Sequence, residues 1–179
     1  MKLDAVFDGV KYELREVTEK DHAWLVELHN DPLVLHNLND PSPITMEHHK
    51  KWWASRNEQK DQRLIFTVNG KRVGFTKFIQ IDNVNRNCLL GADIHKDHRG
   101  KGYANMMWRL MLVYSFRGLG MWRVGLMTAE YNKIAQKVYE KVGFVAEGKL
   151  HQSLKRGDEY FDQITMYMIE PVYRSLHEQ

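Results

Sequence analysis

The segment from Ile94 to Ala104 restricts the fold of this chain more than any other part of the sequence. It reads IHKDHRGKGYA and joins a strand-like run, Cys88 to His95, to a run with helical spacing. Gly100 and Gly102 let the backbone approach a ligand closely and turn successive N–H groups toward one point. The start of a helix adds unpaired N–H groups and a partial positive charge. By itself the segment predicts either a phosphate-binding strand–loop–helix unit or a solvated turn with capping glycines.

The positive charge of this segment is local. Arg99 and Lys101 place two cations in the loop, whereas the whole chain of 179 residues has 26 Lys and Arg against 23 Asp and Glu. Proteins that bind nucleic acid carry a larger and more clustered excess, so we expect no nucleic-acid partner. The loop suits a single anionic ligand, and the charge does not identify that ligand.

Several common site types and locations are disfavoured by what the sequence lacks. No apolar run reaches the ~18 residues that a membrane span needs, and the first residues do not follow a signal-peptide pattern. Cys88 is the only cysteine, which excludes an internal disulfide and fits a reducing compartment. His95 and His98 have no further ligand at metal-binding spacing. We therefore expect a cytoplasmic protein with no membrane attachment and no metal.

The hydrophobic periodicity predicts one domain over residues 1–179, because the length is ordinary for a domain and no linker interrupts it. Alternating patterns predict strands over 11–16, 64–68, 72–75, 88–95, 122–128, 144–154 and 159–169. Helical spacing predicts helices over 18–30, 45–56, 103–118 and 132–142, with a loop over 31–43. The fold class is α+β, or mixed α/β, with a largely antiparallel sheet and a parallel pair around the helix after the glycines.

Three local signals predict a turn and two helix caps within this pattern. Asn69-Gly70 separates two of the predicted strands, and this dipeptide supplies the positive φ angles of a type I′ hairpin turn. Thr18 and Asp21 have the spacing of a capping box before the first helix. We expect Thr45 to cap the second helix.

Two nucleotide-binding signatures do not fit the glycine loop. The P-loop pattern G-x-x-x-x-G-K-[ST] is absent. The Rossmann fingerprint needs Gly or Ala where Asn105 stands, and an acidic residue about 20 residues later, where Arg123 and Val124 stand.

A third signature does fit. Arg99-x-x-Gly102-x-Ala104 resembles the R/Q-x-x-G-x-G/A motif of the GNAT superfamily of acetyl-CoA-dependent N-acetyltransferases. The segment from Asn132 to Phe144 resembles that family's N-x-x-A-x-x-x-Y-x-x-x-G-F motif, and the likeness extends from about residue 12 to 169. The resemblance implies the GNAT fold, in which a parallel strand pair splays apart, and acetyl-CoA as the acetyl donor.

The resemblance also implies which residues hold the cofactor. Backbone N–H groups of the loop would bind the pyrophosphate, Ile94 would donate an N–H near the acetyl carbonyl, and Asn132 and Ala135 would accommodate the pantetheine arm. The candidate cofactor-binding residues are Ile94, Arg99, Gly100, Lys101, Gly102, Tyr103, Ala104, Asn132 and Ala135.

Tyr139 is the candidate catalytic residue. In the family this tyrosine lies near the thioester sulfur, and a phenol can donate a proton to a departing thiolate. Without the resemblance, the pattern favours Tyr139 as a packing residue of an amphipathic helix; with the resemblance, the catalytic role is favoured. Many relatives carry a glutamate general base ten or eleven residues before the loop arginine, but here those positions are Leu89 and Cys88.

The general base is therefore open. A water chain can replace it, or one of the nearby titratable groups can serve; these are Asp93, His95, Glu130, Glu47, His48 and His49.

The acceptor is a primary amine whose identity the sequence leaves open. The run from Pro43 to Trp52 resembles enzymes that acetylate nucleotide-linked 4-amino-4,6-dideoxyhexoses, with Glu47, His49 and Trp53 as candidate substrate contacts. The mixed charge of residues 31–60 suits such an anionic acceptor better than a polycation. The alternatives are spermidine-like polyamines, protein N-termini, or a non-enzymatic acetyl-CoA sensor. The resemblance further implies that the last strands can pair across a homodimer.

Overall fold

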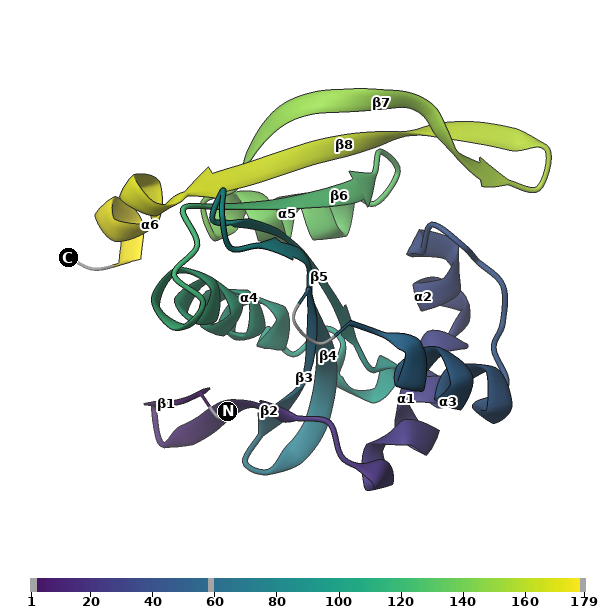
Figure 1. The fold of residues 1–179 in the computed structure, drawn as a ribbon, viewed down its shortest axis with the longest axis horizontal. Helices are drawn as coiled ribbons and strands as arrows, with labels where there is room; N and C mark the ends of the chain where they lie inside the picture. Colours follow the sequence, from purple (N-terminus) through teal and green to yellow (C-terminus); the bar gives the residue numbers. More distant parts are fainter. Residues whose placement is uncertain (1–2, 58–59, 178–179) are drawn as a thin grey trace.

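A single sheet of eight strands runs through the protein in the order β1-β2-β3-β4-β5-β6-β8-β7 (Figure 1). The computed structural model describes residues 3–57 and 60–177. Every neighbouring pair of strands is antiparallel except β5 and β6, which are parallel. The strands are β1 (Leu3–Phe7), β2 (Val10–Glu16), β3 (Asp61–Val68), β4 (Lys71–Asp82), β5 (Asn87–Ile94), β6 (Arg123–Ala129), β7 (Val145–Arg156) and β8 (Glu159–Ile169).

Helices cover both faces of this sheet. In Figure 1, α1, α2 and α3 lie on one side of β4 and β5, and α4 lies on the other. Short segments η1 (Glu19–Asp21), η2 (Lys96–His98) and η3 (Tyr114–Gly118) extend or precede helices. The helices are α1 (His22–His29), α2 (Pro32–Asn37), α3 (Met46–Ser55), α4 (Tyr103–Val113), α5 (Lys133–Lys141) and α6 (Glu170–His177).

The local turn and cap signals in the sequence are confirmed. Asn69 and Gly70 have φ angles of 48° and 77°, as a type I′ turn requires. Thr18 and Asp21 form the capping box, and the Thr45 hydroxyl accepts from the His48 N–H at 3.2 Å. The α+β class with a parallel pair is confirmed as well.

Three elements differ from the sequence prediction. The predicted loop over 31–43 contains α2, because Asp31 caps a helix whose first residue is Pro32. Six residues are too short for periodicity to reveal. Strand β1 and helix α6 are the other two elements that the pattern analysis missed.

The main core lies between the sheet and α4. Fully buried side chains from β3, β4, α4 and β6 form it, including Phe66, Phe78, Met111 and Val124. No helix in the described ranges is long and apolar enough to cross a membrane.

The sheet divides beside this core. Strands β5 and β6 pair only over three positions, from Asn87↔Arg123 to Leu89↔Gly125. Beyond Leu89 the two strands separate, so the remaining part of β5 has a partner in β4 alone among the described strands. This is the splayed parallel pair that the sequence predicts, and it positions the candidate site.

Candidate active site

The glycine loop connects the free end of β5 to the start of α4. Gly100 and Gly102 have φ angles of 73° and 78°, a conformation that L side chains rarely adopt. A Cβ at either position would meet nothing within 4 Å, so the space beside both glycines is open. Gly102 is the N-cap of α4 and no side chain caps that helix, which leaves its first N–H groups available to an anion. The loop therefore fits a phosphate-bearing ligand.

The two cations of the loop make contacts within the protein. Arg99 donates from Nη2 to Oδ1 of Asp31 at 2.7 Å and from Nε to the Ile94 carbonyl at 3.1 Å. The Lys101 ammonium donates to the Asp97 carbonyl at 2.8 Å. Asp31 balances the charge of Arg99, so backbone N–H groups rather than arginine would provide most of the phosphate contacts.

The remaining cofactor candidates lie on the two helices that follow the divided strands. Tyr103 and Ala104 form the first turn of α4. Asn132 caps α5, because its Oδ1 accepts from the Ala135 N–H at 3.2 Å. The family resemblance implies a ligand contact for Asn132, and the structure adds this capping role within the chain.

Tyr139 lies on α5 and packs into an aromatic group. Its ring meets Trp108 and Phe144 with centroids 4.8 and 6.3 Å away. Burial, and after it the negative charge of Asp93, raises the pKa of the Tyr139 phenol above its ordinary value, and a hydrogen bond with Thr128 opposes this shift. The hydroxyl is therefore protonated at neutral pH and can act as a proton donor.

The candidate bases occupy different surroundings. Asp93 is in an ion pair with the Lys77 ammonium at 2.7 Å, and both side chains are largely buried. His95 is buried against Trp24, with Nε2 3.4 Å from a carboxylate oxygen of Glu27. Of these side chains, Asp93 is the one whose negative charge contributes to the raised pKa of Tyr139.

Glu130, the candidate base beyond β6, is held by neighbouring groups. One of its carboxylate oxygens accepts from the Asp162 N–H at 3.2 Å, and the other lies 3.5 Å from the Lys149 ammonium.

The proposed acceptor contacts on α3 do not form one surface. Glu47 is exposed and pairs with Lys51 at 2.8 Å. His49 is buried between α1 and α3, where its Nε2 lies 2.9 Å from Nδ1 of His22. Trp53 packs against His49 and carries the Arg56 guanidinium 3.6 Å from its ring centroid. These contacts give His49 and Trp53 a packing role that the sequence alone did not reveal.

Cys88 is unsuited to nucleophilic chemistry. It is buried in β5, and burial raises the pKa of its thiol to about 12. No group of three or more His, Cys, Asp or Glu side chains in the described ranges is arranged to hold a metal ion.

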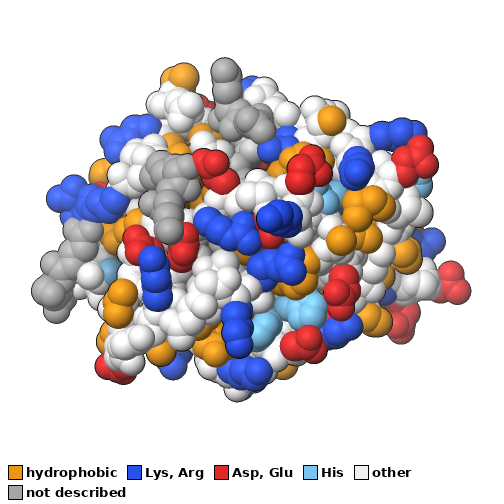
Figure 2. Space-filling view, turned by 90° about the horizontal axis from the view of Figure 1, so that it is seen from below, with side chains coloured by type: hydrophobic (Ala, Val, Ile, Leu, Met, Phe, Trp, Pro, Cys, Tyr) orange, Lys and Arg blue, Asp and Glu red, His pale blue; other side chains and the backbone are white. Residues whose placement is uncertain are grey.

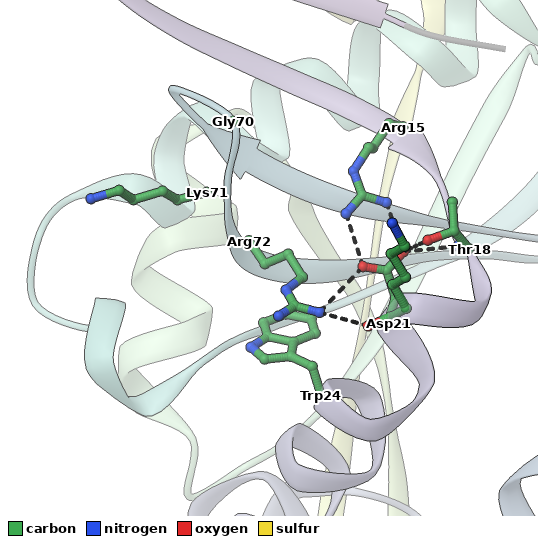
Figure 3. Close-up of a pocket in the computed structure, with 8 residues that line it drawn as sticks. Arg15, Thr18, Asp21, Trp24, Gly70, Lys71 and Arg72 are labelled. Carbon is green, nitrogen blue, oxygen red and sulfur yellow. Dashed lines mark hydrogen bonds and ion pairs between the residues drawn. The ribbon is translucent and has the colours of Figure 1, made fainter.

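A cavity of about 560 Å³ lies between the end of β2, the start of α1 and the β3–β4 turn (Figure 3). Asp21 accepts from both terminal nitrogens of Arg15 at 2.8 and 2.9 Å, and Arg72 approaches the same carboxylate at 3.5 Å. Lys and Arg side chains gather near the middle of the face that is seen from below the view of Figure 1 (Figure 2). We interpret the Arg15–Asp21–Arg72 cluster as a brace that fixes α1 to the sheet.

Comparison with known proteins identifies the family. The profile of the acetyltransferase (GNAT) domain matches residues 11–145, which is more than half of the chain. The chain belongs to the GNAT acetyltransferase family. GNAT acetyltransferases take the acetyl group from acetyl-CoA, so the predicted fold, enzyme class and cofactor are confirmed.

The relatives of this GNAT domain include spermidine N-acetyltransferases and a putative ribosomal N-acetyltransferase. It is 23% identical to the spermidine N(1)-acetyltransferase of Escherichia coli K12 over 167 residues, which cover 93% of this chain and 90% of that protein. It is 31% identical to the Vibrio cholerae spermidine N(1)-acetyltransferase over 59% of this chain and 61% of that one. A crystal structure of the V. cholerae spermidine N-acetyltransferase with CoA and spermine superposes with a TM-score of 0.86 at 24% identity, over 90% of this chain and 97% of that one.

These comparisons change the balance between the predicted acceptors. They give no support to the nucleotide-linked amino sugar that the sequence analysis favoured, and they agree better with its polyamine alternative.

Proposed function

We propose that this enzyme transfers acetyl from acetyl-CoA to a primary amine of a small polyamine of the spermidine class. The observation that carries the proposal is the extent of the likeness to the E. coli spermidine N(1)-acetyltransferase, which covers 93% of the chain. A match of that extent includes the acceptor-side helices α1 to α3 as well as the cofactor loop.

The carboxylates that a polycation needs are supplied by strands rather than by residues 31–60. Asp93 lies in β5 beyond the point where β5 and β6 separate. Glu130 directly follows β6, and its N–H donates to the Asp162 carbonyl at 2.9 Å. The Lys77 ammonium pairs with Asp93, and the Lys149 ammonium pairs with both Glu130 and the Asp162 side chain. The ammonium groups of a polyamine offer these three carboxylates an equivalent partner. The charge count over 31–60 did not include these three carboxylates, because all of them lie outside that range.

Each candidate residue then has a defined task. Acetyl-CoA supplies the activated acetyl group as a thioester. The loop over 99–104 binds its phosphates through backbone N–H groups, and the Ile94 N–H donates toward the acetyl carbonyl oxygen. Asp93 meets the acceptor ammonium and takes a proton from it, so that the nitrogen lone pair becomes free. That lone pair forms the new carbon–nitrogen bond at the acetyl carbonyl carbon. Tyr139 donates its phenolic proton to the sulfur as the carbon–sulfur bond breaks, and the second proton leaving the nitrogen restores the phenol. The buried Cys88 thiol takes no part, so transfer is direct.

An acceptor screen tests this assignment. Release of free CoA thiol is measured with spermidine, spermine, a nucleotide-linked 4-amino-4,6-dideoxyhexose and an N-terminal peptide at matched concentrations. We expect the largest kcat/KM with spermidine or spermine. Turnover confined to the amino sugar or to the peptide would reject the polyamine assignment while leaving acetyl transfer intact. Absence of turnover with every amine, together with tight acetyl-CoA binding, would instead favour the sensor function.

A further inference from the structure

Helix α2 contacts both halves of the divided sheet. In Figure 1, α2 lies below β8 and close to the C-terminal end of β6. At its N-terminus, Asp31 binds Arg99, which follows β5. At its C-terminus, the His36 carbonyl accepts from the Tyr131 hydroxyl at 2.6 Å and from Arg156 Nε at 2.8 Å. Tyr131 follows β6 and Arg156 ends β7, so residues 31–38 join two parts of the sheet that are not hydrogen-bonded to each other beyond Leu89.

Asp31 makes the more buried of these connections. Its side chain is 10% exposed, and Oδ1 accepts from the N–H groups of Leu33 and Val34 at 3.1 and 3.2 Å as well as from Arg99. Burial by itself would raise the pKa of Asp31, but the hydrogen bonds from Arg99 and Val34 outweigh it and lower the pKa below its ordinary value. Asp31 is therefore ionised at neutral pH, and its bond to Arg99 is charge-assisted.

The Arg99 guanidinium also contacts the end of β5 in the candidate site. While Nη2 of Arg99 donates to Asp31, Nε donates to the carbonyl of Ile94 at 3.1 Å. Ile94 is the last residue of β5, and Arg99 directly precedes the two glycines. A rigid planar guanidinium with two fixed partners holds the strand end and the loop in one orientation.

We propose that Asp31 is a positioning residue for acetyl transfer, because it fixes Arg99 and through Arg99 the strand end and loop that bind acetyl-CoA. The proposal rests on the cofactor site described under Proposed function. Loop N–H groups bind a phosphate well only if their orientation is set before the ligand arrives. Because Asp31 also caps α2, this contact makes the cofactor loop and α2 parts of one hydrogen-bonded network.

A double-mutant cycle tests the proposal. Asp31→Ser keeps an N-cap side chain for α2 but is too short to reach Arg99. Arg99→Gln introduces glutamine, which the family motif R/Q-x-x-G-x-G/A also allows at its first position. We measure acetyl-CoA affinity by calorimetry, and kcat and both KM values by thiol release. We expect Asp31→Ser to weaken acetyl-CoA binding about tenfold, and to add little further loss when Arg99→Gln is already present.

Controls separate this role from a general loss of stability. Asp82 also accepts two backbone N–H groups, from Val84 and Asn85 at 2.9 Å each, in the β4–β5 turn. Asp82→Ser removes a comparable cap far from the loop and should leave acetyl-CoA affinity unchanged. Thermal unfolding of each variant shows whether it is folded at the assay temperature.

Each remaining outcome has a definite meaning. Unchanged acetyl-CoA affinity in folded Asp31→Ser, or independent and additive effects of the two substitutions, would overturn the positioning role. Gly102→Glu serves as the reference for the cofactor site itself. If Gly102→Glu abolishes binding while Asp31→Ser does not affect it, the positioning role alone is wrong; if neither affects binding, the loop assignment fails as well.

Discussion

The ring of Tyr139 lies edge to face against the indole of Trp108, with the two centroids 4.8 Å apart. Trp108 belongs to α4 and Tyr139 to α5, so this contact joins the two helices that follow the divided strands. The packing uses the ring of Tyr139, whereas the proposed chemistry uses its hydroxyl. The two roles can therefore be separated by a substitution that keeps the ring.

Tyr139→Phe is expected to lower kcat by about 10²–10⁴-fold, the usual contribution of a positioned proton donor. Stability and acetyl-CoA affinity should change little, because the ring contacts and the loop remain. Burial and the charge of Asp93 raise the phenol pKa, so the wild-type rate should show no decline from phenol ionisation at or below pH 10. Steady-state kinetics from pH 6 to 10 measure both effects.

Tyr160→Phe is the matched control, because Tyr160 is 56% exposed on β8. It should retain wild-type kcat. A wild-type rate for Tyr139→Phe across pH 6–9 would show that Tyr139 is a packing residue and that the sulfur receives its proton from another group.

Gly102→Glu is expected to reduce acetyl-CoA affinity by at least about a hundredfold. The new carboxylate would stand where phosphate should approach the N-terminus of α4, and it repels the phosphate charge. Gly157 is a suitable control, because it also has positive φ and open space around its Cβ position, but it lies in the β7–β8 turn. Calorimetry on folded Gly102→Glu and Gly157→Glu should show a loss in the first variant alone; equal affinities would contradict the loop assignment.

The sequence predicts those parts of the structure that depend on neighbouring residues. The Asn69-Gly70 turn, the Thr18–Asp21 capping box and the glycines before α4 are local signals, and each occurs where expected. The Arg99–Asp31 pair joins positions 68 residues apart, and periodicity carries no information about such contacts.

The acceptor side was harder to predict for a related reason. His49 was expected to contact the acceptor, yet α3 turns it toward His22 of α1. Which face of a short helix becomes buried depends on the helix packed against it, and only the folded chain shows this. The shared contact of Lys149 with Glu130 and Asp162 was likewise missed, because β6, β7 and β8 bring these residues together only in the folded sheet.

Asp93→Asn is expected to lower kcat/KM for spermidine by about 10- to 100-fold, because the acceptor ammonium loses its anionic partner and proton acceptor. Acetyl-CoA affinity should remain within about twofold. Asp158→Asn, in the exposed β7–β8 turn, provides a control with the same change of charge. A normal kcat/KM for Asp93→Asn would exclude Asp93 as the base and favour a water chain.

The His49–His22 pair should make folding stability depend on pH. Burial, followed by the charges of His22 and His29, lowers the pKa of His49 from 6.5 to about 4 in the folded chain. As the pH falls, the unfolded chain binds this proton first, so the contribution is complete above about pH 6.5 and is lost between pH 6.5 and 4. At about 1.4 kcal/mol per pKa unit, the loss is about 3 kcal/mol.

Urea unfolding at pH 7.5, 6 and 4.5 can measure this contribution. In His49→Gln the decrease in unfolding free energy between pH 7.5 and 4.5 should be smaller than in the wild type by most of that amount. His48→Gln is the matched control, because His48 is the exposed neighbour of His49 in α3. Identical pH dependence in wild type and His49→Gln would mean that another group is responsible for any acid destabilisation, and that the imidazole of His49 accepts a proton without cost in the α1–α3 interface.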